Sequence, residues 1–95
     1  MIQISNPEVK AQIKHRLARI EGQLRGVQKM IDEDRDCQDV VQQLTAIRSA
    51  IHSASLHFMQ DVASDCILNL DQSQDQKTQQ EKMKDLIQLL GKVAS

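Results

Sequence analysis

The sequence is poor in aromatic residues, proline and glycine. Phe58 is the one aromatic residue among 95, Pro7 is the one proline, and there are three glycines. No alternation of apolar and polar residues lasts long enough to predict a strand. A core without aromatic side chains must be built from leucine, isoleucine, valine and methionine, which is typical of helices that pack along narrow stripes. We therefore expect an all-α chain that forms a single domain over residues 1–95.

Long apolar runs and cysteines are also scarce. The sequence has no run of about 18 apolar residues and does not begin with the pattern of a signal sequence, so we expect a cytoplasmic protein without membrane contact. Its two cysteines, Cys37 and Cys66, are too few for a disulfide scaffold or a four-cysteine zinc site. Thiols in the cytosol stay reduced unless they sense or catalyse.

Charge is spread unevenly, although the net charge is only −1. Residues 8–29 contain six basic and two acidic residues, whereas the remainder contains six basic and eleven acidic ones. A basic first segment indicates an anionic partner. A solvated helix face explains the same pattern, and charge alone does not decide between the two.

Apolar residues at helical spacing predict three helices, at about residues 7–33, 37–70 and 75–92. The polar run over residues 71–75 separates the second from the third. The first two helices each carry one apolar stripe, formed by Val9, Ile13, Leu17, Ile20, Leu24, Val27 and Ile31, and by Val40, Leu44, Ile47, Ile51, Ala54, Phe58 and Val62.

The first helix has a clear start. Ser5 or Asn6 can cap it, and Ser5 with Glu8 matches a capping box. Gly22 and Gly26 lie inside the same helix, where each costs roughly 1 kcal/mol relative to alanine. Close packing of another helix against these glycines is therefore expected.

The second helix is too long for a compact monomer. At about 1.5 Å per residue it spans roughly 50 Å, whereas a compact globule of this chain length is on the order of 30 Å across. The stripe cannot be covered within one subunit. We expect long helix pairs from two chains to form a four-helix bundle.

Cys37 and Cys66 are 29 residues apart, close to eight helical turns, so they share one face at opposite ends of the second helix. If that helix packs antiparallel on its twofold copy, with the crossing near Ile51 and His52, each Cys37 faces Cys66 of the other chain. Three interpretations stay open: core cysteines, a metal site, and a pair of reactive thiols.

A metal site lacks ligands close to Cys66. The residues one turn away include Val62, Ala63 and Asn69, and none of them is a strong ligand. Two thiolates alone suit Cu(I). Catalysis is also poorly supported, because there is no glycine-rich phosphate loop and no local Cys-His pair. We expect neither a cofactor nor an enzyme.

The stretch HRLARIEGQLRGVQKMIDEDRDC over residues 15–37 resembles the first helix of the CsoR/RcnR family of transcriptional repressors, and the likeness continues through DVVQQLTAIRSAI to Cys66. The resemblance implies three helices per subunit, antiparallel four-helix-bundle dimers that pair into tetramers, and binding to operator DNA. Copper-sensing members carry a histidine between the two cysteines, at the position of Val62. Two cysteines without that histidine resemble the CstR branch, in which persulfides cross-link cysteines of adjacent subunits.

The resemblance also implies the residues that contact DNA. Arg16 matches a DNA-contacting arginine of the family, and Lys10, Lys14 and Arg19 are expected phosphate contacts. Some members carry a further basic residue midway along the second helix, where this chain has Ser53 with Arg48 nearby. The sequence thus predicts a homotetrameric repressor released by persulfides at Cys37 and Cys66. A Cu(I) sensor that uses the same thiolates and a helical oligomerisation module with structural cysteines are the alternatives.

Overall fold

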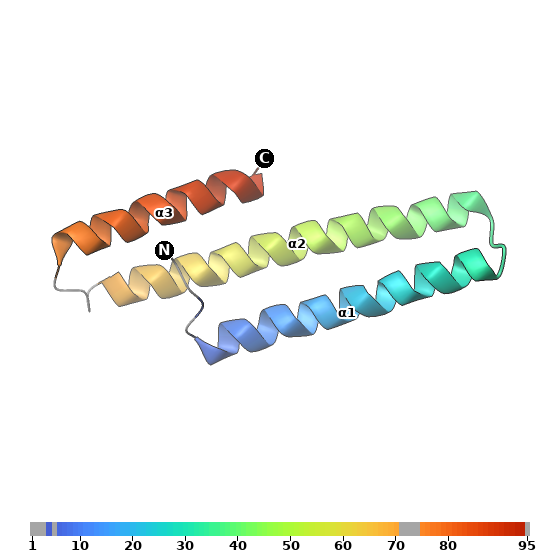
Figure 1. The fold of residues 1–95 in the computed structure, drawn as a ribbon, viewed down its shortest axis with the longest axis horizontal. Coiled ribbons are helices and arrows are strands. Elements are labelled where there is room, and N and C mark those ends of the chain that lie inside the picture. Colours follow the sequence, from blue (N-terminus) through green and yellow to red (C-terminus); the bar gives the residue numbers. More distant parts are fainter. Residues whose placement is uncertain (1–3, 5, 71–74, 95) are drawn as a thin grey trace.

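The computed structural model describes residue 4 and residues 6–70 and 75–94, which form three α-helices and no strand. α1 spans Pro7–Asp32, α2 spans Cys37–Leu70 and α3 spans Gln76–Ala94. α1 and α2 make a long antiparallel hairpin, and α3 turns back along the second half of α2, on the edge opposite α1 (Figure 1). The predicted all-α chain of three helices is confirmed.

The side chains of an asparagine and an aspartate cap the N-terminal ends of α1 and α3. Asn6 caps α1, and its Oδ1 accepts a hydrogen bond from the N–H of Glu8 at 2.9 Å. The Asn6 Nδ2 donates to Asp65 Oδ1 at 3.3 Å, which joins the start of α1 to the last part of α2. Asp75 accepts from the N–H of Lys77 at 3.1 Å before α3. The alternative cap, Ser5, and the polar residues 71–74 lie outside the described residues.

Two core clusters hold the helices together. The first, which we call the three-helix cluster, consists of Val9, Met59, Val62 and Leu86 and joins all three helices. The second consists of Ile20, Val27, Ile47 and Ala54 and joins α1 to α2. The stripes predicted from the sequence therefore supply all four residues of the second cluster and two of the first, Val9 and Val62.

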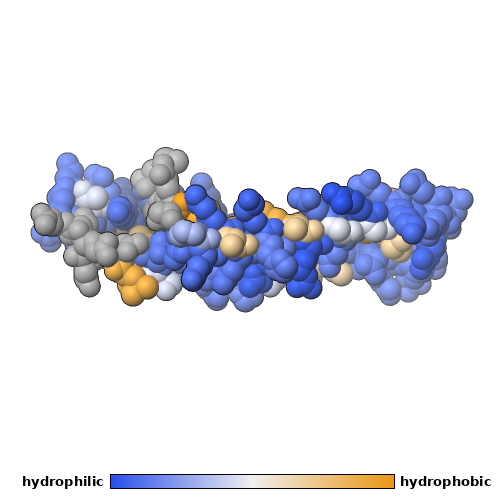
Figure 2. All heavy atoms as spheres, turned by 90° about the horizontal axis from the view of Figure 1, so that it is seen from below, coloured by the Kyte–Doolittle hydropathy of each residue, from blue (hydrophilic) through white to orange (hydrophobic). Residues whose placement is uncertain are grey.

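The molecule is a rod rather than a globule. Its extents are 60 × 26 × 15 Å and its radius of gyration is 17.9 Å, whereas a compact chain of this length would have a radius of gyration of about 12 Å. None of the helices in the described part is both long enough and apolar enough to cross a membrane. The face seen in Figure 2 is largely hydrophilic, with separate apolar spots along its length.

Each apolar stripe is only partly covered. In α1, Leu17, Leu24 and Ile31 remain 47%, 41% and 57% exposed, and in α2 both Leu44 and Ile51 remain 48% exposed. We call these five residues the leucine face. Because they lie on the faces of α1 and α2 that the hairpin leaves open, another surface is needed to cover them.

The expected close packing at the two helical glycines is wrong for the single chain. A Cβ added at Gly22 or Gly26 would have nothing within 4 Å in the described part of the structure. Both glycines therefore leave the backbone of α1 accessible on its outer side.

The exposed leucine face predicts that the chain self-associates. Replacing Ile51 with glutamate places a charge in this face, so we expect the mass measured by light scattering at micromolar concentration to fall toward that of the monomer. Leu68→Gln is the matched control, because Leu68 is 72% exposed on another side of α2. A wild-type chain that is monomeric under these conditions contradicts the prediction.

Candidate sensing and nucleic-acid sites

Cys37 is the first residue of α2, directly after the turn that follows α1. Asp34 in this turn has a φ of 57°, a left-handed conformation that aspartate adopts more readily than most residues. Asp36 Oδ1 accepts a hydrogen bond from the N–H of Gln38 at 3.5 Å, which supports the start of the helix. The thiol of Cys37 is exposed.

Cys66 lies near the other end of α2 and has different surroundings. It is half-buried and packs against the three-helix cluster, together with Met83 of α3. A rotation of about 100° per residue over the intervening 29 positions leaves the two cysteines within about 20° of the same direction. The helical rise separates them by about 43 Å, so no contact forms within one chain.

Val62 occupies the helical turn before Cys66, and its side chain is only 8% exposed in the three-helix cluster. Among the described residues there is no group of three or more histidine, cysteine, aspartate and glutamate side chains that could hold a metal ion. His15, His52 and His57 are all exposed. The chain alone therefore offers Cys66 no nitrogen or carboxylate ligand set.

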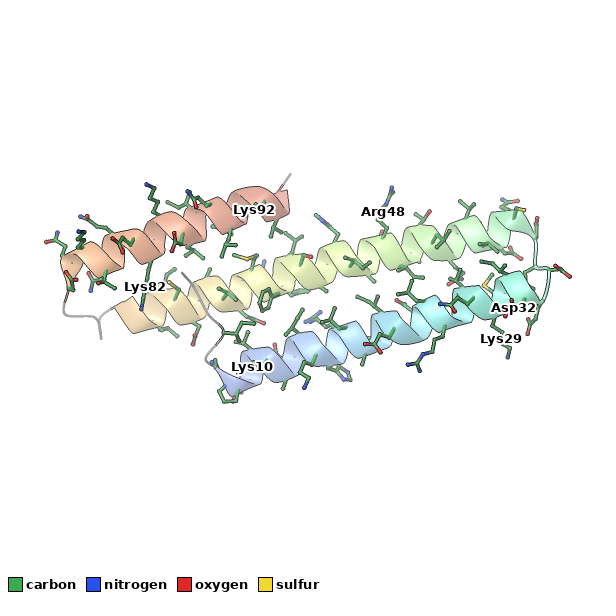
Figure 3. All side chains as sticks on the ribbon, viewed as in Figure 1. Lys10, Lys29, Asp32, Arg48, Lys82 and Lys92 are labelled. Carbon is green, nitrogen blue, oxygen red and sulfur yellow. The ribbon has the colours of Figure 1, made fainter. Side chains whose placement is uncertain are left out.

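The five cations expected to contact DNA have no ion pair among the described residues. Lys10, Lys14, Arg19 and Arg48 are exposed, and Arg16 is partly buried. By contrast, α1 also contains two cations whose charge is compensated: Arg25 lies 3.8 Å from Glu21, and Lys29 lies 3.8 Å from Glu33. Figure 3 shows Lys10 and Lys29 at opposite ends of α1, with Arg48 on the edge of α2 that points away from α1.

The structure divides these cations between two faces of the hairpin. Measured from the buried Ile20, a rotation of about 100° per residue places Arg16 and Arg19 on one side of α1 and Lys10 and Lys14 on the other. Arg16 and Arg19 line one hollow of about 340 Å³ with His15. We call the side that carries Arg16, Arg19 and His15 the arginine face.

The same rotation separates Ser53 from Arg48 by about 140° around α2, and both residues line one hollow with His52 and Leu56. A hollow lined by Gln12, Ser64 and Leu68 joins the arginine side of α1 to the Ser53 side of α2. Arg48 therefore lies between the leucine face, which it borders, and Ser53, with which it shares a hollow.

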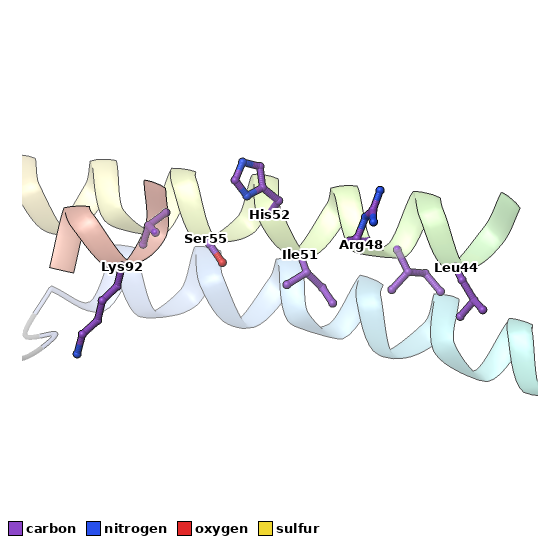
Figure 4. Close-up of a pocket in the computed structure, with 8 residues that line it drawn as sticks. Leu44, Arg48, Ile51, His52, Ser55 and Lys92 are labelled. Carbon is purple, nitrogen blue, oxygen red and sulfur yellow. The ribbon is translucent and has the colours of Figure 1, made fainter. Parts of the chain in front are cut away.

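Arg48 lines a hollow of about 520 Å³ between the middle of α2 and the end of α3. Its apolar wall includes Leu44 and Ile51, while Arg48, His52 and Lys92 lie at its edge (Figure 4). In the close-up Arg48 and His52 point away from the wall formed by Leu44 and Ile51. The hollow is thus a continuation of the leucine face.

The chain resembles several copper-sensing repressors in sequence and structure. It is 42% identical to the copper-sensing transcriptional repressor CsoR of Bacillus subtilis over 66 residues, and this matched stretch covers 70% of this chain and 65% of the relative. It is 44% identical over 52 residues to the copper-sensing transcriptional repressor RicR of Mycobacterium tuberculosis, which covers 55% of this chain and 54% of the relative. The matched stretch is thus less than two thirds of the length of either relative.

The fold match covers the whole chain. The structure of the copper-sensing repressor CsoR with Cu(I) from Geobacillus thermodenitrificans superposes with a TM-score of 0.75 at 29% identity, and the match covers 100% of this chain and 95% of that one. The model of the metal-sensitive transcriptional repressors, which are regulators and not enzymes, matches residues 9–92. The chain therefore belongs to the family of metal-sensitive transcriptional repressors.

Proposed function

We propose that this chain is a DNA-binding repressor of the cytoplasm whose inducer acts on a pair of thiols, Cys37 of one subunit and Cys66 of another. Family membership supports the repressor role. Cations without ion pairs on α1 support contact with phosphate groups, since each is free to replace a counterion of DNA. Cys37 and Cys66 supply reactive groups at both ends of α2.

The leucine face supports pairing between two chains. An antiparallel copy that covers Leu44 and Ile51 would place the twofold axis between Ile51 and His52, midway between positions 37 and 66. Cys37 of each chain then meets Cys66 of the other. Such a dimer covers the leucine face and leaves the arginine face open to DNA. Pairing of two dimers would give the tetramer expected from the sequence.

The buried valine at position 62 is the observation that favours sulfur chemistry over metal binding. Val62 packs among apolar side chains, so the turn beside Cys66 holds no imidazole. We infer that the inducer is a persulfide or polysulfide. One cysteine thiolate attacks the sulfane sulfur of the persulfide, which releases a thiolate and leaves a cysteine persulfide. The partner cysteine then attacks it, and hydrogen sulfide leaves as the disulfide bridge forms.

Bridging changes DNA affinity through a shift between two states of the oligomer. A link between the ends of two α2 helices favours the arrangement in which the arginine faces no longer match the operator. A tenfold loss of DNA affinity requires the bridged state to bind only about 1.4 kcal/mol less tightly.

Cu(I) sensing is the second candidate, and the relatives favour it. CsoR and RicR are copper-sensing repressors. Two thiolates suit the soft Cu(I) ion, whereas Ni(II) prefers nitrogen and oxygen ligands, which the described residues do not gather around Cys66. Cys37 and Cys66 would hold the ion between two subunits, where it would join the same two helix ends as a sulfur bridge.

Arg16→Ala tests the DNA contact. We expect affinity for operator fragments to fall roughly tenfold. The slope of log affinity against log salt concentration should be smaller in magnitude by about one, because one phosphate contact is removed. Arg25→Ala is the matched control, since Arg25 is compensated by Glu21 in the same helix. The affinity and its salt dependence are both obtained from fluorescence anisotropy over a range of salt concentrations. Equal losses for the two variants, or none for Arg16→Ala, would contradict the assignment.

The inducer is identified by treating reduced protein with a persulfide donor or with Cu(I) and measuring operator affinity and intact mass. We expect the donor to release DNA and to yield covalent dimers, because the two thiols meet across the subunits. Cys37→Ser and Cys66→Ser should abolish both effects. Release of DNA by Cu(I) but not by the persulfide donor, without covalent dimers, would reject the sulfur mechanism in favour of the second candidate.

A further inference from the structure

Three sulfur-containing side chains lie in or against the three-helix cluster. Met59 belongs to the three-helix cluster, and both Cys66 and Met83 pack against that cluster. Met59 and Cys66 come from α2, whereas Met83 comes from α3. A thiol and two thioethers thus belong to or border one apolar cluster.

The antiparallel register of α2 and α3 places Met83 level with Val62. Val62 and Leu86 are buried in the same cluster, and Met83, one turn before Leu86, packs against it. α2 and α3 run antiparallel, so the part of α3 that carries Met83 and Leu86 lies beside the part of α2 that carries Val62. Met83 thus faces the helical turn that precedes Cys66.

The direction of the side chains separates the two methionines. Side chains in an α-helix lean toward its N-terminus. Met59 lies two turns before Cys66 in the same helix, so its side chain leans away from the thiol. α3 runs antiparallel to α2, and its N-terminal end lies beside the C-terminal end of α2. The side chain of Met83 therefore leans toward Cys66.

We propose that the thioether of Met83 is a third sulfur ligand for Cu(I), beside Cys66 and Cys37 of a second subunit. Cu(I) accepts thioethers as well as thiolates, whereas harder ions do not. With valine at position 62, α2 has no imidazole near Cys66. Met83 on the neighbouring α3 offers a soft sulfur donor instead. The inference rests on the second candidate function, in which the two thiolates hold Cu(I). It makes α3 part of the sensing site.

The proposal is tested on full-length protein loaded anaerobically with one Cu(I) per chain. X-ray absorption at the copper edge should show three sulfur neighbours in the wild type and two in Met83→Leu. Competition with a Cu(I) chelator should show an affinity about tenfold lower for Met83→Leu, the fold-change expected when about 1.4 kcal/mol of binding is lost. Leucine is close to methionine in volume, and circular dichroism checks that the helices persist.

Met59→Leu is the matched control, because Met59 belongs to the same cluster but leans away from the thiol. It should keep three sulfur neighbours and the wild-type affinity. The role of Met83 would be overturned if copper has three sulfur neighbours in Met83→Leu or only two in the wild type. A loss of Cu(I) affinity confined to Met59→Leu would also overturn it. Cu(I) binding that survives Cys66→Ser, or is absent in the wild type, would instead reject the second candidate function together with this inference.

Discussion

The structure depends on the burial of the apolar stripe along α2. The other two helices of the same chain cover only part of that stripe. α2 has 34 residues, and α1 and α3 lie against it from two sides. The hairpin buries Ile47 and Ala54, while Leu44 and Ile51 stay half exposed although they belong to the same stripe. The proposed antiparallel copy would cover Leu44 and Ile51 at little cost, because the surface is already ordered and apolar. The distance between the two cysteines is a consequence of the same helix length.

Helix positions and caps could be predicted from the sequence because they depend on local pattern. The stripe from Val40 to Val62 indicates α2, and the sequence named Asn6 as a possible cap of α1. The division of the cations between two faces was not predicted, because it depends on which side of each helix is buried. A single stripe in α1 did not reveal that Arg16 and Lys14 lie on opposite sides of Ile20.

The environment of Cys66 shows a second limit of the sequence. Val62 was recognised as the position that lacks a histidine, but its burial in a cluster that also contacts Met83 depends on how α3 packs on α2. No local signal connects residues in different helices at this separation. The structure adds that the two thiols differ, since Cys37 is exposed at a helix start and Cys66 is half-buried among apolar side chains. A site assembled from both would join a solvent-facing group to a shielded one.

Mixing two single-cysteine chains tests most directly whether Cys37 and Cys66 meet between subunits. One chain carries Cys37→Ser with heavy nitrogen, the other carries Cys66→Ser with natural nitrogen, and the mixture is treated with a persulfide donor. The account predicts covalent dimers that contain one heavy and one light chain, with little cross-linking in either variant alone. Equal cross-linking within each variant, or no mixed dimers, would contradict the antiparallel pairing on which the proposed mechanism rests.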